Sequence, residues 1–381
     1  MSRYSRHIIL SEIGQIGQDK LTNAKVLVVG AGGLGCPVLQ YLAAAGIGTL
    51  GIIDFDVVEA SNLQRQILFG TSCLGQNKAA AAKKRLEDLN NEISIIAYAE
   101  KLSYQNALEL FNQYDLVVDG TDNFETRYLI NDASIITGKP LVFGAIFKFE
   151  GQVSVFNYQN GPSYRCLFPN PPEKNTVPNC SEIGVLGVLP GIIGSMQANE
   201  VLKIILEIGH VLSGKLLCYN ALTAQTTVLK INKTEAIINS VLKDKDIFSK
   251  KQLDFNCEFA SDEVSIKDVL SKENIQFIDV REVHERPKID AIEVTSIPLS
   301  ELENSLDKIH TEKQKMIFCQ SGMRSKKAVS MLKELHIDNC FSIKEGALEI
   351  NNQVQYLQGF KNLAGENKTL QDSKNLAGEN R

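Results

Sequence analysis

A glycine-rich turn between an apolar strand and a helix is the feature that most constrains how this chain can fold. The run VLVVGAGGLG spans residues 26–35. Residues 25–30 predict a buried strand and residues 34–45 a helix, which places the glycines in the turn between them. Such glycines permit a tight turn and let the backbone approach a phosphate. They are Gly30, Gly32, Gly33 and Gly35.

A carboxylate closes the next strand. The apolar segment 49–53 is followed by Asp54, about twenty residues after the glycines. A carboxylate at this place can accept a hydrogen bond from a ribose hydroxyl, whether the ligand is a dinucleotide or ATP. At this point a NAD-dependent dehydrogenase therefore remains an alternative.

The following segments alternate between strand and helix patterns, which indicates a doubly wound, mostly parallel sheet of the α/β class. Two further strands, near 141–146 and 151–157, suggest an antiparallel extension of this Rossmann-like sheet. A helix is expected at 191–208. The alternating elements are predicted at 76–90, 93–98, 105–112 and 115–119.

Polar residues that suit a triphosphate lie at three places downstream. They are Asn62, Gln64 and Arg65 in a polar segment, Lys78 at the start of a helix, and Asp122 with Asn123 after a strand. Two cations of different reach can neutralise a departing pyrophosphate, and a carboxylate at a strand's carboxyl end can hold Mg²⁺. A hydride-transfer site does not need this set, so the cluster favours phosphorus chemistry.

A second chemical motif, CQSGMRS, spans residues 319–325. It follows the apolar strand 316–318 and precedes a helical pattern at 326–335. A thiol at a helix N-terminus has a lowered pKa, and Arg324 adds a positive charge. The pattern predicts that Cys319 is a reactive sulfur.

Composition restricts the class of protein. The 381 residues are 44% hydrophobic and carry a net charge of −5, and no Lys/Arg cluster indicates a nucleic-acid partner. Apolar stretches are too short to span a bilayer and no secretory leader is evident, so we expect a cytoplasmic protein. The eight cysteines form no CxxC pair, and we expect all of them to be reduced.

The chain divides into two expected domains. The first domain covers residues 1–235 and is followed by a charged linker at 236–260. A smaller α/β domain with a parallel sheet covers residues 261–360. The tail, 361–381, contains the heptapeptide KNLAGEN twice and is expected to be disordered.

Seven segments together resemble the ThiF/MoeB/HesA-type adenylyltransferases, relatives of the ubiquitin-activating enzymes. The segments are RYSRHIIL (3–10), GAGGLG (30–35), DFD (54–56), SNLQRQ (61–66), GQNK (75–78), DGTDN (119–123) and GVLGVLPGIIGSMQANEVLK (184–203). The resemblance covers residues 1–230 and implies ATP and Mg²⁺ as ligands.

Site roles are implied by this resemblance, position by position. Gly33 and its neighbours approach the nucleotide, Asp54 holds the ribose, and Asp122 binds Mg²⁺. Arg65 and Lys78 stabilise charge on the triphosphate. The segment lining the phosphates consists of Ser61, Asn62, Leu63, Gln64 and Arg65.

The same resemblance implies a homodimer, because Arg6 would reach the triphosphate of the neighbouring subunit. Cys180 matches the family's transferable-acyl cysteine. The family's first zinc-binding CxxC is replaced by Ser163-Tyr-Arg-Cys166 and the second pair is missing, so no structural zinc is expected.

Residues 261–360 resemble a rhodanese. Besides the Cys319 loop they contain FIDVRE, in which Asp279 and Arg281 resemble that family's loop-bracing pair, although a surface ion pair is the simpler interpretation. Only four residues separate Cys319 from Arg324, one fewer than in the related phosphatases, and this shorter loop favours a persulfide. Cys340 is expected in the core.

Together the resemblances imply one activity. The first domain would adenylate the Gly-Gly carboxylate of a ubiquitin-like sulfur carrier, preferably the small subunit of molybdopterin synthase. A Cys319 persulfide, loaded by a cysteine desulfurase or thiosulfate, would then convert it to a thiocarboxylate. Carriers of thiamine synthesis or tRNA thiolation, a dehydrogenase–rhodanese fusion and a non-catalytic scaffold remain alternatives.

Overall fold

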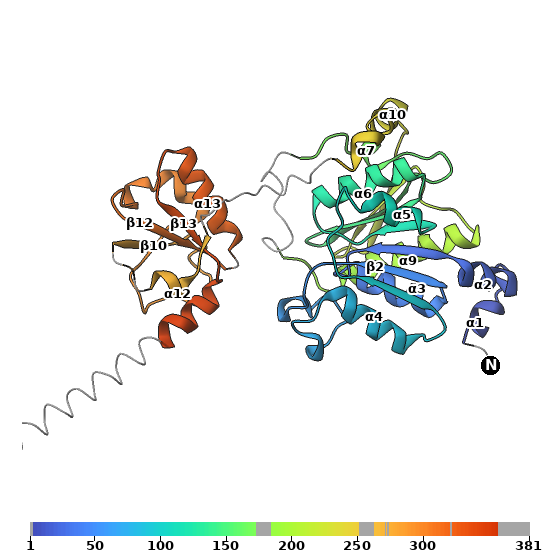
Figure 1. Ribbon diagram of the computed structural model, residues 1–381, viewed down its shortest axis with the longest axis horizontal. Helices are drawn as coiled ribbons and strands as arrows, with labels where there is room; N and C mark the ends of the chain where they lie inside the picture. The colour runs from blue at the N-terminus through green and yellow to red at the C-terminus, as the bar shows by residue number, and fades with distance from the viewer. Residues whose placement is uncertain are drawn as a thin grey trace, which may run out of the picture. The chain divides into compact units, whose positions relative to one another are not determined.

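Two separate sheets organise the chain (Figure 1). The computed structural model describes residues 3–172, 184–250 and 263–356, apart from Ser271, Glu273 and Ser321. The chain separates into one unit that ends at Leu253 and a second that begins at Asp254. The glycine motif belongs to the first unit and Cys319 to the second.

The first unit contains an eight-stranded mixed sheet of order β3-β2-β1-β4-β5-β6-β7-β8. The strands from β3 to β5 pair in parallel, whereas β5, β6, β7 and β8 pair antiparallel. The predicted doubly wound sheet with an antiparallel extension is confirmed. The strands are β1 (Lys25–Val29), β2 (Thr49–Ile53), β3 (Ser94–Tyr98), β4 (Leu116–Asp119), β5 (Leu141–Phe147), β6 (Glu150–Phe156), β7 (Lys215–Asn220) and β8 (Gln225–Lys230).

Helices cover both faces of this sheet (Figure 1). One face packs against α2 (Gly14–Asn23), α3 (Gly35–Ala45), α4 (Lys78–Leu89) and α9 (Leu189–Leu206). The other packs against α5 (Ala107–Asn112), α6 (Phe124–Thr137), α7 (Tyr164–Leu167) and α11 (Lys245–Phe248). Because helices bury both faces, the inner strands are continuous apolar runs rather than alternating ones.

The strand order determines at which point of the sheet edge a ligand site can form. β1 lies between β2 and β4. After β1 the chain adds β2 and β3 on one side of it, and then crosses over to add β4 and the later strands on the other side. The register pairs Val29 with Asp119, which brings the loops after β1 and β4 together. Ligands of open α/β sheets bind in the crevice at such a switch point.

Two parts of the first unit differ from the expectations. The helix α6 was not predicted; it begins after Asn123, whose side chain accepts the N–H of Thr126 at 2.9 Å, and ends at Gly138. Charged residues suggested that the linker starts at residue 236, but α10 (Glu235–Lys243) and α11 lie there. Phe248 at the end of α11 is 1% exposed and belongs to the core of the first unit.

The second unit contains a five-stranded parallel sheet of order β11-β10-β12-β13-β9. The helix α13 (Met323–Glu334) packs against β12 and β13, and α12 (Ile266–Val269) is a short helix near the start of the unit. The strands are β9 (Glu263–Val264), β10 (Ile275–Asp279), β11 (Val294–Ser296), β12 (Gln314–Phe318) and β13 (Cys340–Ile343). The repeated tail lies outside the described residues.

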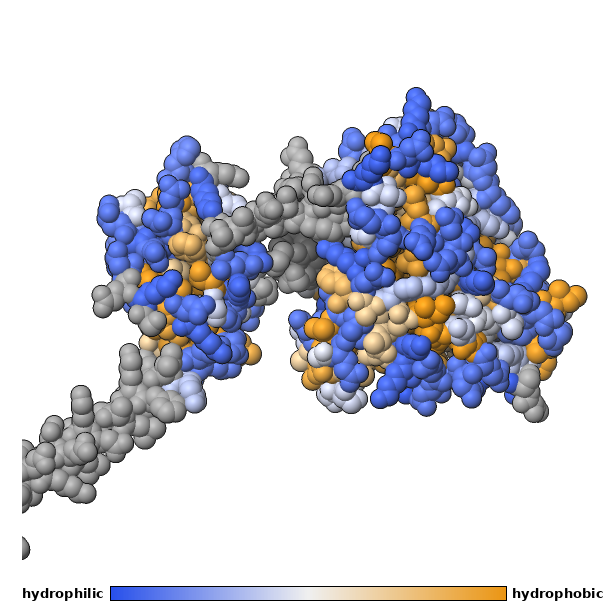
Figure 2. Space-filling model, in the orientation of Figure 1, coloured by the Kyte–Doolittle hydropathy of each residue, from blue (hydrophilic) through white to orange (hydrophobic). Residues whose placement is uncertain are grey.

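The visible surface of the first unit is mostly hydrophilic, with smaller hydrophobic areas (Figure 2). Large exposed apolar side chains occur around α1 (Ser5–Ile8) and α2, where Ile9 is 73% and Ile16 is 77% exposed. No described helix combines the length and apolar character that crossing a membrane requires.

Candidate active sites

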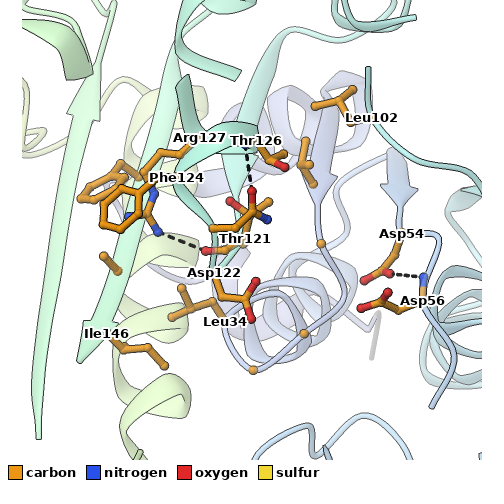
Figure 3. A pocket seen from close by; sticks show the side chains of 18 of the residues that line it. Leu34, Asp54, Asp56, Leu102, Thr121, Asp122, Phe124, Thr126, Arg127 and Ile146 are labelled. Atoms are coloured by element: carbon orange, nitrogen blue, oxygen red, sulfur yellow. Dashed lines mark hydrogen bonds between the residues drawn. The ribbon is translucent and has the colours of Figure 1, made fainter. Parts of the chain in front are cut away.

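A cavity of about 630 Å³ opens where β1, β2 and β4 end. In Figure 3, Asp54 and Asp56 lie at one side of this cavity, Arg127 and Phe124 at the other, and Asp122 between them. The cavity brings together eight residues expected at a nucleotide site: Gly30, Gly32, Gly33, Asp54, Arg65, Lys78, Asp122 and Asn123.

The glycine loop is shaped by close backbone contacts. Gly30 has a φ of +91°, a conformation that other residues rarely adopt. A Cβ on Gly35 would lie 1.9 Å from the carbonyl oxygen of Gly30, so Gly35 is required by packing even though it does not line the cavity. Gly32 faces open space, with Gln66 Nε2 3.8 Å from the position of a Cβ. The loop thus leaves room for a ligand beside the backbone.

Asp54 holds this loop in place. Its Oδ2 accepts the N–H of Ala31 at 2.8 Å, and its Oδ1 accepts the N–H of Asp56 at 2.9 Å. Burial raises the pKa of Asp54, while the two backbone bonds and Lys78 act in the opposite direction. The carboxylate is 9% exposed and still lines the cavity, where further lone pairs can accept a ribose hydroxyl.

Two cations line the cavity beside the loop. Lys78, the first residue of α4, is 8% exposed at its side chain and lies 3.0 Å from Oδ2 of Asp56. Arg65 is half-buried and donates to the carbonyl oxygen of Ser61 at 3.1 Å. Two cations on different elements can neutralise charge on neighbouring phosphates.

Asp122 is exposed and follows β4 by three residues. No three His, Cys, Asp or Glu side chains among the described residues form a metal-binding group. Mg²⁺ in nucleotide sites is commonly held by one or two carboxylates together with the substrate's phosphates. Asp122 at the cavity therefore suits a cation that arrives with ATP rather than a cation held by the protein alone.

Sequence reasoning missed Arg127, a buried residue of α6 on the cavity wall. Its Nη2 donates to the carbonyl oxygen of Thr121 at 3.2 Å (Figure 3), and its Nε lies 3.4 Å from Oδ2 of Asp119. That Nε makes no hydrogen bond of normal geometry, and the contact with Asp119 is an ion pair. The sequence signal that could have identified Arg127 is its position four residues after Asn123. The helix α6, which was not predicted, turns this side chain inward.

Gln66 was also missed. It is 4% exposed, lines the cavity and has a side-chain oxygen without a hydrogen-bond partner. The side-chain oxygen of Gln66 and the Nε of Arg127 are therefore polar atoms on the cavity wall to which a ligand can bond. With the open glycine loop and the two cations, the residues present fit ATP.

Six expected residues do not line the cavity. Gly35 supports the glycine loop, and Arg6 is exposed on α1. The other four occupy the turn that precedes Arg65: Ser61, Asn62, Leu63 and Gln64. Asn62 accepts the N–H of Glu59 at 3.2 Å and so shapes this turn. Cys180 lies outside the described residues.

The Cys319 loop joins β12 to α13 in the second unit. Cys319 is 1% exposed, and its Sγ lies 3.7 Å from the hydroxyl of Ser325. Ser325 donates to the carbonyl oxygen of Gly322 at 2.9 Å and lies 2.8 Å from the hydroxyl of Ser342. The sulfur thus sits between a strand end and a helix start, beside a chain of hydroxyls. Cys340 is buried in β13, as expected.

Both arginines of this site are paired. Arg324 binds Glu285 through two bonds of 2.6 and 2.7 Å, a partner that the sequence did not indicate. Arg281 binds Asp279 at 2.9 and 2.8 Å and is 2% exposed, so this pair is buried and not a surface ion pair. Arg281 also donates to the side chain of Gln320, which follows Cys319.

Cys166 takes hydrogen bonds at the place of the missing zinc motif. Its Sγ accepts the N–H of Ser163 at 3.4 Å and that of Thr234 at 3.3 Å. These contacts connect α7 to the segment after β8.

A doubly wound sheet with a glycine loop, paired cations and a strand-end carboxylate defines a nucleotide-dependent enzyme of the adenylyltransferase class. The chain belongs to the ThiF family, whose pattern matches residues 4–237.

Three relatives show how far the likeness extends. A sulfur carrier protein adenylyltransferase of Thermus thermophilus is 52% identical over 61% of this chain and 88% of its own. A probable adenylyltransferase/sulfurtransferase MoeZ of Mycobacterium tuberculosis is 39% identical over 93% and 94%. The adenylyltransferase and sulfurtransferase MOCS3 of Xenopus laevis is 40% identical over 87% and 81%. The chain is an enzyme that combines these two activities, and the dehydrogenase alternative has no support among these relatives.

Solved structures share the fold of the first unit. The E. coli MccB structure with ATP is 24% identical, with a TM-score of 0.54, and the match covers 61% of this chain and 72% of that one. A complex of the microcin C7 enzyme MccB with N-formylated MccA is 25% identical, with a TM-score of 0.55, over 61% and 73%.

Proposed function

We propose that the first unit uses ATP and Mg²⁺ to adenylate the C-terminal Gly-Gly carboxylate of a ubiquitin-like sulfur carrier, and that Cys319 supplies the sulfur for a thiocarboxylate. The observation that carries the proposal is one cavity that combines the open glycine loop, Arg65, Lys78 and Asp122. The similarity to MoeZ over 93% of the chain supports the coupling to the second unit.

In the first step the carrier carboxylate attacks the α-phosphorus of ATP and pyrophosphate leaves. Asp54 would orient the ribose, and Arg65 and Lys78 would neutralise charge on the phosphates. Asp122 would hold Mg²⁺, which would supply positive charge to the phosphates. Positioning and charge neutralisation carry most of such a displacement.

In the second step the outer sulfur of a Cys319 persulfide attacks the acyl-adenylate and AMP leaves. The carrier is then joined to Cys319 by an acyl disulfide. We assign its release to a second thiol, Cys180, which would form a disulfide with Cys319 and free the thiocarboxylate. An external dithiol then reduces that disulfide.

The carrier that we favour is the small subunit of molybdopterin synthase, because relatives over most of the chain carry the names MoeZ and MOCS3. A carrier of thiamine synthesis or of tRNA thiolation would use the same chemistry. The cytoplasm is the proposed compartment, in keeping with cysteines that form no CxxC pair.

Mass spectrometry of candidate carriers tests this function. Each carrier is incubated with the enzyme, ATP, Mg²⁺ and a sulfur donor, and a carrier that exchanges one oxygen for sulfur is the substrate. Cys319→Ala should abolish this exchange and leave carrier-dependent ATP–pyrophosphate exchange intact. Cys340→Ala, a buried thiol of the same unit, is the control. Loss of pyrophosphate exchange in Cys319→Ala would refute the division of roles.

We also propose a homodimer in which Arg6 acts on the neighbouring subunit's nucleotide. The exposed Ile9, at the end of α1, and Ile16, in α2, give these two helices an apolar surface for such contact. Arg6→Ala and Lys78→Ala should each be inactive alone, whereas mixed dimers contain one intact site. After subunit exchange, about a quarter of the sites should be active. An inactive mixture, with heterodimers verified by native mass spectrometry, would refute action in trans.

A further inference from the structure

The arginine beside Cys319 is already bonded to a carboxylate. Arg324 Nη1 lies 2.6 Å from Oε1 of Glu285, and Nη2 lies 2.7 Å from Oε2. The two side chains are only 26% and 21% exposed, so water screens this pair incompletely. Two parallel charge-assisted bonds both orient the guanidinium and neutralise it.

The other guanidinium at this loop is neutralised in the same way. Arg281 donates to both oxygens of Asp279, and its other donors reach Gln320 and the carbonyl oxygen of Pro287. It is buried, so no face of it is open to a ligand from solution. Both arginines that contact the Cys319 loop therefore have a carboxylate partner.

The charge that the loop must accept depends on the sulfur donor. With thiosulfate, Cys319 attacks the outer sulfur, the S–S bond breaks, and sulfite leaves with the electron pair as a dianion. With a persulfide R–S–SH, Cys319 again attacks the outer sulfur, and R–S⁻ leaves and takes up a proton. Neither transfer needs an oxidant. The first places two negative charges at the loop throughout, whereas the second places at most one.

We propose that Glu285 selects the sulfur donor: by holding Arg324 it disfavours dianionic thiosulfate and favours a persulfide carried on the cysteine of a partner protein. The inference rests on the proposed sulfurtransferase role of Cys319 and names the class of its donor. The bonds from Arg324 also lower the pKa of Glu285, which keeps the carboxylate charged at neutral pH. Backbone N–H groups at the start of α13 remain to stabilise the transferred sulfur.

Loading of Cys319 in the full chain tests this selection. One sulfur atom gained at Cys319 is followed over time by intact-protein and peptide mass spectrometry, with either sodium thiosulfate or a cysteine desulfurase supplied with L-cysteine. Glu285→Gln frees Arg324 and should raise the loading rate from thiosulfate by about tenfold or more. Loading from the desulfurase should stay within about threefold, because that donor brings less charge.

Glu282→Gln is the matched control. Glu282 is exposed, carries the same charge and lies three residues before Glu285, and the described contacts include no bond from its carboxylate to Arg324. Because Glu282 acts on Arg324 only through a weaker electrostatic interaction, Glu282→Gln should shift the ratio of the two loading rates much less than Glu285→Gln does. Glu285→Ala should shift the ratio as Glu285→Gln does, and its loading from the desulfurase verifies that the unit is folded.

The experiment distinguishes a failure of donor selection by Glu285 from a failure of the proposed role of Cys319. If wild-type Cys319 is loaded from the desulfurase but Glu285→Gln and Glu285→Ala leave the ratio unchanged, donor selection by Glu285 is refuted and the sulfurtransferase role stands. An equal shift in Glu282→Gln also refutes it, because the effect would then be one of overall charge. If neither donor loads wild-type Cys319, the proposed role of Cys319 fails together with the inference.

Discussion

Lys78 and Asp56 form an ion pair in the wall of the nucleotide cavity, with 3.0 Å between Nζ and Oδ2. The lysine side chain is 8% exposed and that of the aspartate 50%. A nucleotide phosphate that enters the cavity therefore competes with Asp56 for the ammonium group.

Lys78→Ala should lower kcat/KM for carrier-dependent ATP–pyrophosphate exchange by at least about 100-fold, because a positioned cation on the departing phosphates is lost. Lys83→Ala is the control on the same helix, since the side chain of Lys83 is 43% exposed and pairs with Glu87. It should change the rate by less than about twofold. Equal losses in the two variants would contradict a specific role for Lys78.

Two glycines of one loop should respond differently to a methyl group. Gly35→Ala would place a Cβ 1.9 Å from the carbonyl oxygen of Gly30, so we expect loss of the folded first unit. Gly32→Ala meets no atom closer than 3.8 Å and should fold normally, but its methyl group occupies space beside the cavity. Circular dichroism and ATP titration separate the outcomes. A stable Gly35→Ala protein with normal ATP affinity would disprove the loop packing.

The buried pair of Arg127 and Asp119 predicts a large stability effect. Burial raises the pKa of Asp119, while Arg127 and Thr121 lower it, so the arginine compensates a carboxylate that is 0% exposed. Arg127→Ala should lower the free energy of unfolding of the first unit by about 3–5 kcal/mol. The chain contains no Trp, so urea unfolding is followed by far-UV circular dichroism.

The matched comparison is the double variant Arg127→Met with Asp119→Asn. It removes both charges and should recover part of the stability lost in Arg127→Ala, because no unpaired charge remains buried. A double variant less stable than Arg127→Ala would indicate that the ion pair is not the source of the loss.

The pH dependence of the second unit should follow Glu285. Its pKa lies below the usual value of 4.5, chiefly because of the bonds from Arg324. This contribution is present above pH 4.5 and is lost as the pH falls through the lowered pKa. Wild type should therefore melt at a higher temperature than Glu285→Gln at pH 7, and this gap should narrow as the pH falls below 4.5. A gap that is constant with pH would contradict this.

The sequence predicted those parts of the site that follow strands directly. Asp54 and Asp122 come after β2 and β4, and the glycines after β1, and parallel strands bring their carboxyl ends to one edge. For these residues, the order of strands and loops along the chain was sufficient to predict that they lie together. The resemblance to a rhodanese indicated the pairing of Asp279 with Arg281, which are two residues apart.

The residues that were missed depend on contacts distant in the chain. Arg127 was missed because α6 is buried along most of its length and so lacks the amphipathic period that predicts a helix. Glu285 lies 39 positions before Arg324, and the intervening chain forms two strands, so no spacing rule connects them. The segment after residue 234 is rich in charged residues, and its composition therefore suggested a linker. Composition does not reveal that its Phe248 is buried in the core of the first unit.

The bond that Asp54 accepts from the N–H of Ala31 has a consequence for the speed of nucleotide capture. It helps to keep the glycine loop in one shape in the protein without nucleotide, so the entropy of ordering that loop is lost during folding rather than on encounter with a ligand. Association should then resemble the docking of two rigid bodies, with a rate governed by diffusion and charge instead of by loop closure.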